Sequence, residues 1–328
     1  MRLRLVQGTA AAMLLASVIC LAGCSGKEDG SELNVGYFNN VTHAQALYMK
    51  ATGSLEEALP DGTELSWTAF NAGPAEVEAL FSGDIDIGYI GPVPAITANV
   101  RSKGDITILS GASKAGAVLV KASGSDISNV TDLSGKTVAI PQIGNTQHLC
   151  LLNLLKENQL APVDKGGDVD VTAVENADVM NMMDQGNIDA ALVPEPWGTT
   201  LERNGAEIVL DYDEVYKNGD YPVAVVVVRE EFLKDHPDIV DVFLEEHIKA
   251  TDYMVQNTEE ASSVVNEEIN AATGKSLDAD ILAGAFGKID FSTDVNEQAI
   301  RDFADISLEQ EFIAQDYENI FSERAGKD

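Results

Sequence analysis

The chain has 328 residues, with 21 lysines and arginines against 54 aspartates and glutamates, and a formal net charge of −33 at pH 7. This acidity excludes nucleic acid and anionic lipid headgroups as expected partners, because both repel a negative surface. The charge does not identify a ligand, since local dipoles rather than the whole surface set the properties of a pocket. A chain of this length is typical of about two domains.

The first residues have the layout of a secretory signal. Arg2 and Arg4 form a short basic region, and residues 10–21 form an apolar stretch that is too short for a membrane-spanning helix. Small residues follow, as expected before a cleavage site. We therefore predict a signal peptide over residues 1–23 and an exported mature protein.

The end of this segment, Leu-Ala-Gly-Cys at residues 21–24, resembles a bacterial lipobox, in which the cysteine becomes the lipidated first residue of the mature protein. A chance cysteine after an ordinary signal peptide is the alternative. The resemblance implies that a lipid on Cys24 anchors the protein to the cell membrane, facing away from the cytoplasm. Residues 24–32 are polar and rich in glycine, serine and acids, which predicts a flexible tether.

Loss of the signal peptide removes Arg2 and Arg4 but no acidic residue, and so takes the formal charge from −33 to −35. With Cys24 assigned to lipid, Cys150 is the one cysteine left in the mature chain. An internal disulfide is therefore excluded, and the fold has to be stable from its core alone, which about 300 residues can supply.

From residue 33 onward, strand-like and helix-like segments alternate in two series. The first has strands over 33–37, 65–70 and 85–90 with helices over 43–59, 74–81 and from about 93. The second has strands over 137–140, 169–174 and 188–193 with helices over 146–158 and 177–185. This alternation predicts parallel β-α-β units and an α/β fold.

One junction recurs in both series. Ser-Gly-Asp-Ile-Asp-Ile at 82–87 matches Gln-Gly-Asn-Ile-Asp-Ala at 185–190. In each, glycine ends a helix because it tolerates the left-handed cap conformation, and a buried strand follows. Two lobes of similar wiring explain the recurrence, with a chance repeat of a common signal as the alternative.

Two extended segments, 106–121 and 221–229, are predicted to cross between the lobes as hinge strands. The chain then becomes helical, with predicted helices from Pro237 and over 258–269, 278–287 and 296–315 that would cap the first lobe. The expected organisation is a first lobe of residues 33–113 and 222–328 and a second lobe of residues 114–221.

Ligands of open parallel sheets bind beyond the carboxyl ends of the strands, where helices begin. Four loops, residues 38–43, 91–94, 141–147 and 194–197, occupy such positions, and their free N–H groups and positive helix ends suit an anion. A single loop of this kind can be no more than a helix start, because every helix needs a cap. The placement of all four loops at equivalent strand ends is therefore stronger evidence for a binding site than any one loop. The candidate ligand-binding residues are Asn40, Thr42, His43, Gly91, Pro92, Gly144, Asn145, Thr146, Gln147, Glu195 and Trp197.

Several blocks, in order along the mature chain, resemble solute-binding lipoproteins of the nitrate/sulfonate/taurine importer family. They are residues 34–46, 70–74, 84–95, 132–141, 144–147 and 193–197. The resemblance implies a type 2 periplasmic-binding fold with two lobes, a two-strand hinge and closure over a ligand. It implies that residues 144–147 hold the ligand's anionic group, with 91–92 and 40–43 contributing from the other lobe. An ABC importer permease is the implied partner; we expect a monomer without a cofactor.

The resemblance leaves the ligand open among alkanesulfonates, taurine, nitrate, bicarbonate and pyrimidine precursors of thiamine. The four loops contain no lysine or arginine. This favours a small organic oxyanion, a sulfonate above all, because its charge is spread over three oxygens that neutral donors can bind. Lys114, near the expected hinge, is the closest candidate cation, although a solvated surface position is the simpler interpretation.

Three other functions stay open at this point. Pyrimidine-forming synthases share the implied fold, but they use a cysteine-rich segment that this chain lacks, so we expect no enzyme. A metal receptor would need His43, His148 and Glu195 to converge, and the set is thin for a tetrahedral site; His148 reads better as a first-turn helix residue, and His236 and His247 as surface residues. A receptor that reports to a sensor would have the same sequence.

Overall fold

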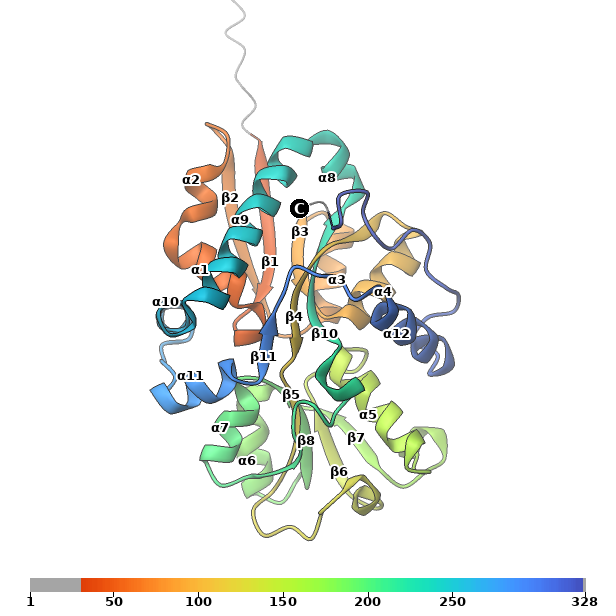
Figure 1. Ribbon diagram of the computed structural model, residues 1–328. Helices are drawn as coiled ribbons and strands as arrows, with labels where there is room; N and C mark the ends of the chain where they lie inside the picture. Colours follow the sequence, from red (N-terminus) through yellow and green to blue (C-terminus); the bar gives the residue numbers. More distant parts are fainter. Residues whose placement is uncertain (1–30, 327–328) are drawn as a thin grey trace, which may run out of the picture. The chain divides into compact units, whose positions relative to one another are not determined.

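The computed structural model describes residues 31–326 (Figure 1). The predicted signal peptide, Cys24 and nearly all of the predicted tether lie outside these residues. Within 31–326, no helix combines the length and the apolar character that crossing a membrane requires.

The first sheet has six strands in the order β11-β4-β10-β3-β1-β2. Their bounds are β1 (Glu32–Phe38), β2 (Glu64–Phe70), β3 (Ile87–Ile90), β4 (Ile106–Ala115), β10 (Pro222–Arg229) and β11 (Ile289–Phe291). Strands β2, β1 and β3 are parallel, whereas β10 runs antiparallel to both β3 and β4. The carboxyl ends of β1, β2 and β3 therefore lie at one edge of this sheet.

The second sheet has five strands in the order β7-β6-β8-β5-β9. Their bounds are β5 (Ala117–Lys121), β6 (Thr137–Ile140), β7 (Asp170–Ala173), β8 (Ala190–Pro194) and β9 (Glu207–Leu210). Strands β7, β6 and β8 are parallel and β5 is antiparallel to β8. The three parallel strands of the two sheets are thus ordered alike, as the recurring junction predicts.

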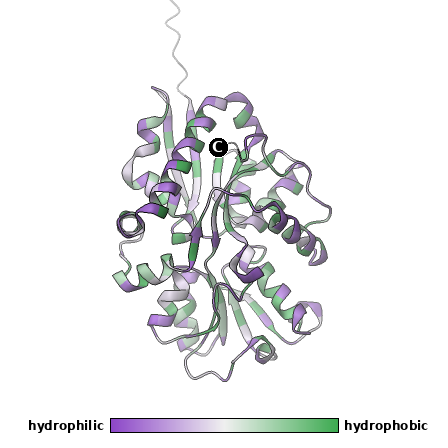
Figure 2. Ribbon diagram, in the orientation of Figure 1, coloured by the Kyte–Doolittle hydropathy of each residue, from purple (hydrophilic) through white to green (hydrophobic). Residues whose placement is uncertain are grey.

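Helices cover both sheets. Those of the two α/β series are α1 (Ala44–Thr52), α2 (Ser54–Ala58), α3 (Gly73–Ser82), α4 (Pro92–Ser102), α5 (Thr146–Glu157), α6 (Val179–Asp184) and α7 (Trp197–Arg203). The single helix predicted over 43–59 is divided, because Gly53 has a left-handed backbone with φ of 70° between α1 and α2. Figure 2 shows the apolar residues concentrated on the strands and on the inner helix faces.

The C-terminal part contains α8 (Glu230–Asp235), α9 (Pro237–Gln256), α10 (Thr258–Thr273), α11 (Ala279–Phe286) and α12 (Glu297–Glu309). Helices α9 and α10 pack on α1, as expected of a cap on the first lobe. The last two helices also pack on first-lobe helices, α11 on α10 and α12 on α4, and in addition they contact the second lobe, α11 at α7 and α12 at α5.

The lobes are linked at the end of β4. Ala115 and Gly116 have positive φ angles of 60° and 73°, so the chain turns there before β5 begins. The Tyr221 carbonyl accepts a hydrogen bond from the Ala115 N–H at 3.0 Å, which ties the returning chain to the same point. Near the start of β4, Ile108 forms hydrogen bonds with residues close to the end of the described chain. Its N–H donates to the Ile320 carbonyl, and its carbonyl accepts from the Ser322 N–H.

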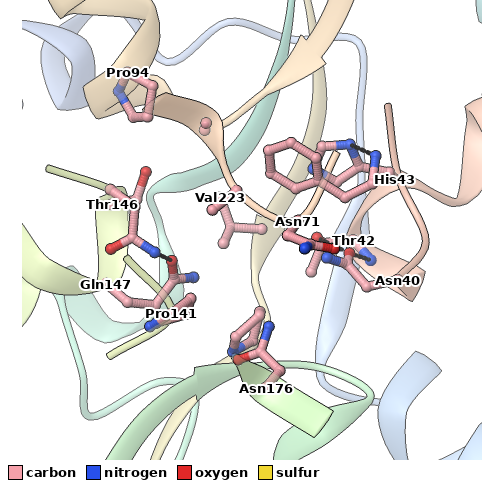
Figure 3. A pocket seen from close by; sticks show the side chains of 16 residues that line it. Asn40, Thr42, His43, Asn71, Pro94, Pro141, Thr146, Gln147, Asn176 and Val223 are labelled. Atoms are coloured by element: carbon pink, nitrogen blue, oxygen red, sulfur yellow. Dashed lines mark hydrogen bonds between the residues drawn. The ribbon is translucent and has the colours of Figure 1, made fainter. Parts of the chain in front are cut away.

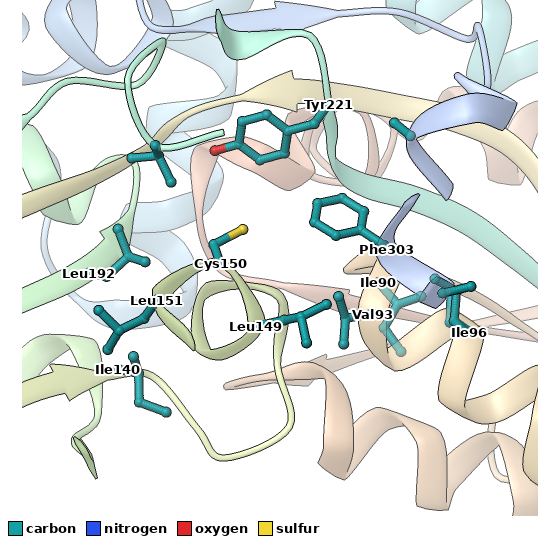
Figure 4. Close-up of a cluster of buried hydrophobic side chains, with 14 of the residues drawn as sticks. Ile90, Val93, Ile96, Ile140, Leu149, Cys150, Leu151, Leu192, Tyr221 and Phe303 are labelled. Carbon is teal, nitrogen blue, oxygen red and sulfur yellow. The ribbon is translucent and has the colours of Figure 1, made fainter. Parts of the chain in front are cut away.

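One hydrophobic cluster is continuous through both lobes (Figure 4). It contains Ile90 and Val93 from the first lobe, Leu149 and Leu192 from the second, and Phe303 from α12. Cys150 lies within this cluster, and burial raises the pKa of its thiol to about 12. The thiol is therefore an apolar packing group with no thiolate character near neutral pH.

A buried carboxyl group on α3 faces the first sheet. Glu76 is fully buried, and neither of its carboxyl oxygens has a hydrogen-bond partner among the described residues. A Cβ on Gly36 or Gly88 would lie 2.5 or 2.3 Å from its Oε1, so these register partners in β1 and β3 make the room for it. Burial raises the pKa of Glu76 well above its usual range, which favours the neutral acid.

Glu76→Gln keeps this shape and removes the ionisation. Because the folded-state pKa is raised, stability from the protonated group is fully present below its unfolded value of 4.5 and is lost as pH rises. We expect the variant to match the wild type near pH 4 and to gain about 1.4 kcal/mol per pH unit above 4.5, until the folded-state pKa is reached. Urea unfolding at pH 4, 6 and 8 measures this; a stability difference that is constant across the series would contradict it.

Candidate functional site

A cavity of about 30 Å³ lies where the carboxyl ends of the parallel strands of the two lobes face each other, with room for one or two water molecules. It is lined by Phe38, Asn40, Thr42, His43, Asn71, Ala72, Gly73, Gly91, Pro94, Pro141, Asn145, Thr146, Gln147, Asn176, Pro194 and Val223. Figure 3 shows Thr146 and Gln147 across the cavity from Asn40, Thr42 and His43. None of the lining residues is a lysine, arginine, aspartate or glutamate.

The first-lobe wall is held by two local caps. Asn40 begins a 3₁₀ turn, η1 (Val41–His43), and its Oδ1 accepts hydrogen bonds from the N–H of Thr42 at 3.0 Å and the Thr42 hydroxyl at 2.5 Å. The His43 Nδ1 accepts from the Phe38 N–H at 3.2 Å, and its ring stacks on that of Phe38 with centroids 4.1 Å apart. An accepting Nδ1 places the proton of the neutral ring on Nε2, so this wall offers a donor without a charge.

The second-lobe wall is the start of α5. Asn145 caps this helix, with its Oδ1 accepting from the His148 N–H at 2.8 Å. The N–H groups of Thr146 and Gln147 precede the first bonded turn and have no protein partner among residues 31–326. The Thr146 hydroxyl is also buried without a partner in that range. The positive end of a 12-residue helix therefore presents two N–H groups and one hydroxyl to a ligand.

The two walls approach each other closely at a glycine. A Cβ on Gly91, the cap of α4, would lie 2.5 Å from the Thr146 hydroxyl oxygen of the other lobe. The Gly91 φ of −65° is open to every residue type, so it is the close approach of the lobes, and not the backbone conformation, that demands glycine here.

The comparisons with known proteins come from sequence and from structure. Residues 26–267 match the NMT1-like family. This chain belongs to the NMT1-like family. It is 33% identical over 204 residues to the taurine-binding periplasmic protein of Escherichia coli (strain K12), which covers 61% of this chain and 60% of the relative. It is 32% identical over 172 residues to a putative aliphatic sulfonates-binding protein of the same strain, and this match covers 52% of this chain and 52% of the relative.

The matched region thus spans half to three-fifths of these two curated relatives. A solved structure, the alkanesulfonate-binding protein SsuA from Xanthomonas axonopodis pv. citri bound to MOPS, superposes with a TM-score of 0.72 at 21% identity. That match covers 87% of this chain and 95% of the other. The predicted periplasmic-binding-protein fold, with its two α/β lobes, is confirmed.

Four predicted ligand-binding residues of this NMT1-like chain do not line the cavity. Pro92 and Gly144 lie one position beside lining residues, and Gly144 supplies the turn before α5 with φ of 87°. Glu195 is fully buried with its oxygens directed to Thr199 and Lys288. Trp197 is half-buried and packs on the apolar cluster of the second lobe.

Nine lining residues are not among the eleven selected ligand-binding residues. Four of them belong to the four candidate loops, namely Phe38, Pro94, Pro141 and Pro194, and five lie outside those loops, namely Asn71, Ala72, Gly73, Asn176 and Val223. Asn71 and Asn176 follow the ends of β2 and β7, so extending the strand-end rule to every parallel strand would have found them. Lys114 is not among the lining residues; it pairs with Asp294 at 3.4 Å and Asp220 at 3.9 Å.

Three of the four histidines are buried and neutral. Burial lowers the pKa of His43 to about 3 and that of His148 and His247 to about 4. The prediction of a surface position for His247 is wrong: it lies on α9 between the Tyr89 hydroxyl at 2.8 Å and the Gly111 carbonyl at 2.9 Å. In the part of the chain that the structure describes, no three His, Cys, Asp or Glu side chains gather as a metal site would require.

These lowered pKa values predict a loss of stability in mild acid. Below 6.5 the unfolded chain takes up protons at His43, His148 and His247 that the folded chain does not, so stability falls with pH until the folded values of about 3 to 4 are reached. Each histidine contributes at most about 1.4 kcal/mol per pH unit. NMR checks this: the Cε1–H signals of these three rings should not titrate between pH 7.5 and 5, and a midpoint above 6 for any of them would contradict their assignment as neutral.

Proposed function

We propose that this protein is a solute-binding receptor outside the cytoplasm that captures a small organic oxyanion, with an aliphatic sulfonate or taurine favoured, and delivers it to an ABC importer. The observation that carries the proposal is an uncharged cavity between two lobes, in which a helix start and a hydroxyl have no protein partner within residues 31–326. Relatives named for taurine and aliphatic sulfonates support the same ligand class.

The chemistry of the cavity fits a sulfonate better than a compact inorganic anion. A sulfonate spreads one charge over three oxygens, so each oxygen can be held by a neutral donor such as the Thr146 N–H, the Gln147 N–H or the Thr146 hydroxyl. The dipole of α5 adds favourable potential at the same point. Phe38, Pro94 and Val223 supply apolar surface for the carbon chain. Nitrate, bicarbonate and a thiamine pyrimidine are the alternative ligands.

Ligand capture is proposed to proceed by opening and closure of the lobes. A cavity of about 30 Å³ is too small for an organic anion to enter or fill without movement, and Gly91 and Thr146 already meet across it. We assign residues 33–113 and 222–328 to one moving body, whose helices α11 and α12 also contact the other lobe, and residues 114–221 to the second body, which begins with the turn at Ala115 and Gly116.

Anchoring through Cys24 completes the proposal, with the permease as protein partner and the receptor acting as a monomer without catalysis. Cys24 lies outside the described residues, so its support comes from the lipobox resemblance. Palmitate labelling of cells that produce the wild type or Cys24→Ser tests it. We expect label and membrane association in the wild type alone; label retained by the variant would refute the assignment.

A thermal-shift screen tests the ligand class. The panel contains ethanesulfonate and longer alkanesulfonates, taurine, nitrate, bicarbonate, the thiamine pyrimidine, and zinc with an EDTA control. A ligand at 100 times its Kd adds about 2.7 kcal/mol to the folded state, which shifts the Tm visibly. We expect the alkanesulfonates and taurine to raise the Tm. A rise in Tm with zinc alone or with the pyrimidine alone would overturn the oxyanion proposal.

A double-mutant cycle at Gly91 and Thr146 tests closure. Gly91→Ala places a methyl group on the Thr146 hydroxyl only when the lobes are together, so it should weaken binding of the sulfonate from the screen about tenfold or more and reduce ligand-induced compaction in small-angle scattering. Thr146→Ala removes both the obstacle and one donor. In that background the alanine at position 91 should cost little, and equal costs in the two backgrounds would exclude the close contact as the cause.

A further inference from the structure

A buried acid directly follows a cavity-lining residue in the sequence. Glu195 follows Pro194, which lines the cavity, and its side chain is fully buried. Its Oε2 accepts from the Thr199 N–H and its Oε1 from the Thr199 hydroxyl, each at 3.0 Å. These bonds tie Glu195 to the first turn of α7 but leave a carboxylate close in sequence to a cavity whose lining, among the described residues, contains no cation. An uncompensated negative charge at this place would repel an anionic ligand.

The compensating charge comes from a distant part of the chain. Lys288 Nζ lies 3.3 Å from Glu195 Oε1. Within residues 31–326, Lys288 is the residue that forms an ion pair with Glu195. The lysine side chain is only 14% exposed. Its ammonium group forms no hydrogen bond with the described residues, so it contributes a charge rather than a directed hydrogen bond.

Lys288 also belongs to the other lobe. It directly precedes β11, whose Ile289 pairs with Ala115 at the end of β4 in the first sheet, whereas Glu195 follows β8 of the second sheet. The Glu195 N–H in turn donates to the Gly116 carbonyl at 2.7 Å. The pair is therefore formed across the hinge itself, where it can persist as the lobes move.

Two further acids face Lys288. Asp211, beyond β9, lies 3.7 Å away and Glu202 of α7 lies 3.9 Å away, and their side chains are 41% and 46% exposed. Solvent screens charges of this kind, so neither needs a buried partner. Glu195 has no such screening. Burial raises the pKa of Glu195, and the Lys288 charge acts against that rise.

We propose that Lys288 is a positioning residue for anion binding: it cancels the charge of Glu195 across the hinge and so keeps the uncharged cavity receptive to an anion. The inference rests on the proposed function, since it requires an anionic ligand. It gives Glu195 the role of holding the first turn of α7 with a charge that has to be offset, in place of direct ligand contact.

The test compares variants that remove one or both charges of the Lys288–Glu195 pair in the full mature chain. Calorimetry at pH 5.5, 7 and 8.5 measures the affinity of each variant for ethanesulfonate and for nitrate. Lys288→Met should lower the affinity for the bound anion by roughly tenfold at pH 8.5. The loss should be smaller at pH 5.5 than at pH 8.5, because burial raises the pKa of Glu195 and, without Lys288 to oppose that rise, the neutral acid is favoured as the pH falls. Wild-type affinity should change little over this range, and Lys288→Arg should restore it.

The matched control is Glu195→Gln combined with Lys288→Met, which removes both charges and keeps the side-chain volumes similar. This variant should recover most of the wild-type affinity and show no pH dependence. Melting of each ligand-free variant is measured alongside. If Lys288→Met lowers the Tm without changing affinity, or if the double variant binds as weakly as Lys288→Met, the proposal is overturned. A wild-type chain that binds no anion of the screen would instead overturn the proposed function, and this inference with it.

Discussion

The close approach of Gly91 to the Thr146 hydroxyl is the contact on which the site depends. It lets the starts of α4 and α5 face each other with almost nothing between them, and it makes the cavity small enough for donors from both lobes to reach one group. A side chain of any size at Gly91 would separate the walls. The spacing of the two walls is therefore set by the absence of a methyl group at Gly91.

Electrical neutrality is the second constraint. The chain has a formal charge of −33, yet no Lys, Arg, Asp or Glu lines the cavity, and His43 is kept neutral by burial. Helix ends and hydroxyls can hold an anion in such a place because they do so without the cost of desolvating a counter-charge. A cavity of this kind is sensitive to any net charge behind its wall, which is why the partner of Glu195 matters.

Much of the fold could be predicted from sequence because its signals are local. Glycine at helix ends, apolar strands and capping residues such as Asn145 depend on neighbours in the chain, and the family resemblance ordered them into two lobes. The loops at 40–43, 91 and 145–147 were found by the rule that ligands meet strand ends, and the structure brings residues from all three to one cavity.

What could not be predicted depends on contacts between distant segments. His247 is buried because α9 lies on the first sheet. The residues near it in the sequence do not indicate that Tyr89 and Gly111 are its hydrogen-bond partners. Glu195 and Trp197 follow the right strand, but the directions of their side chains are set by α7 and Lys288. The room for Glu76 comes from Gly36 and Gly88, two glycines 52 residues apart that only strand pairing brings together.

The late return of the chain to β4 has a consequence for the order of folding. Ile108 donates a hydrogen bond to Ile320 and accepts one from Ser322, and β11 joins the same strand, so the first lobe stays incomplete until nearly all of the described chain is available. The strands of the second sheet come from one uninterrupted stretch, residues 117–210, and need no such wait. The lobe that lies later in the sequence can thus form first, and the lobe that begins the chain is finished last.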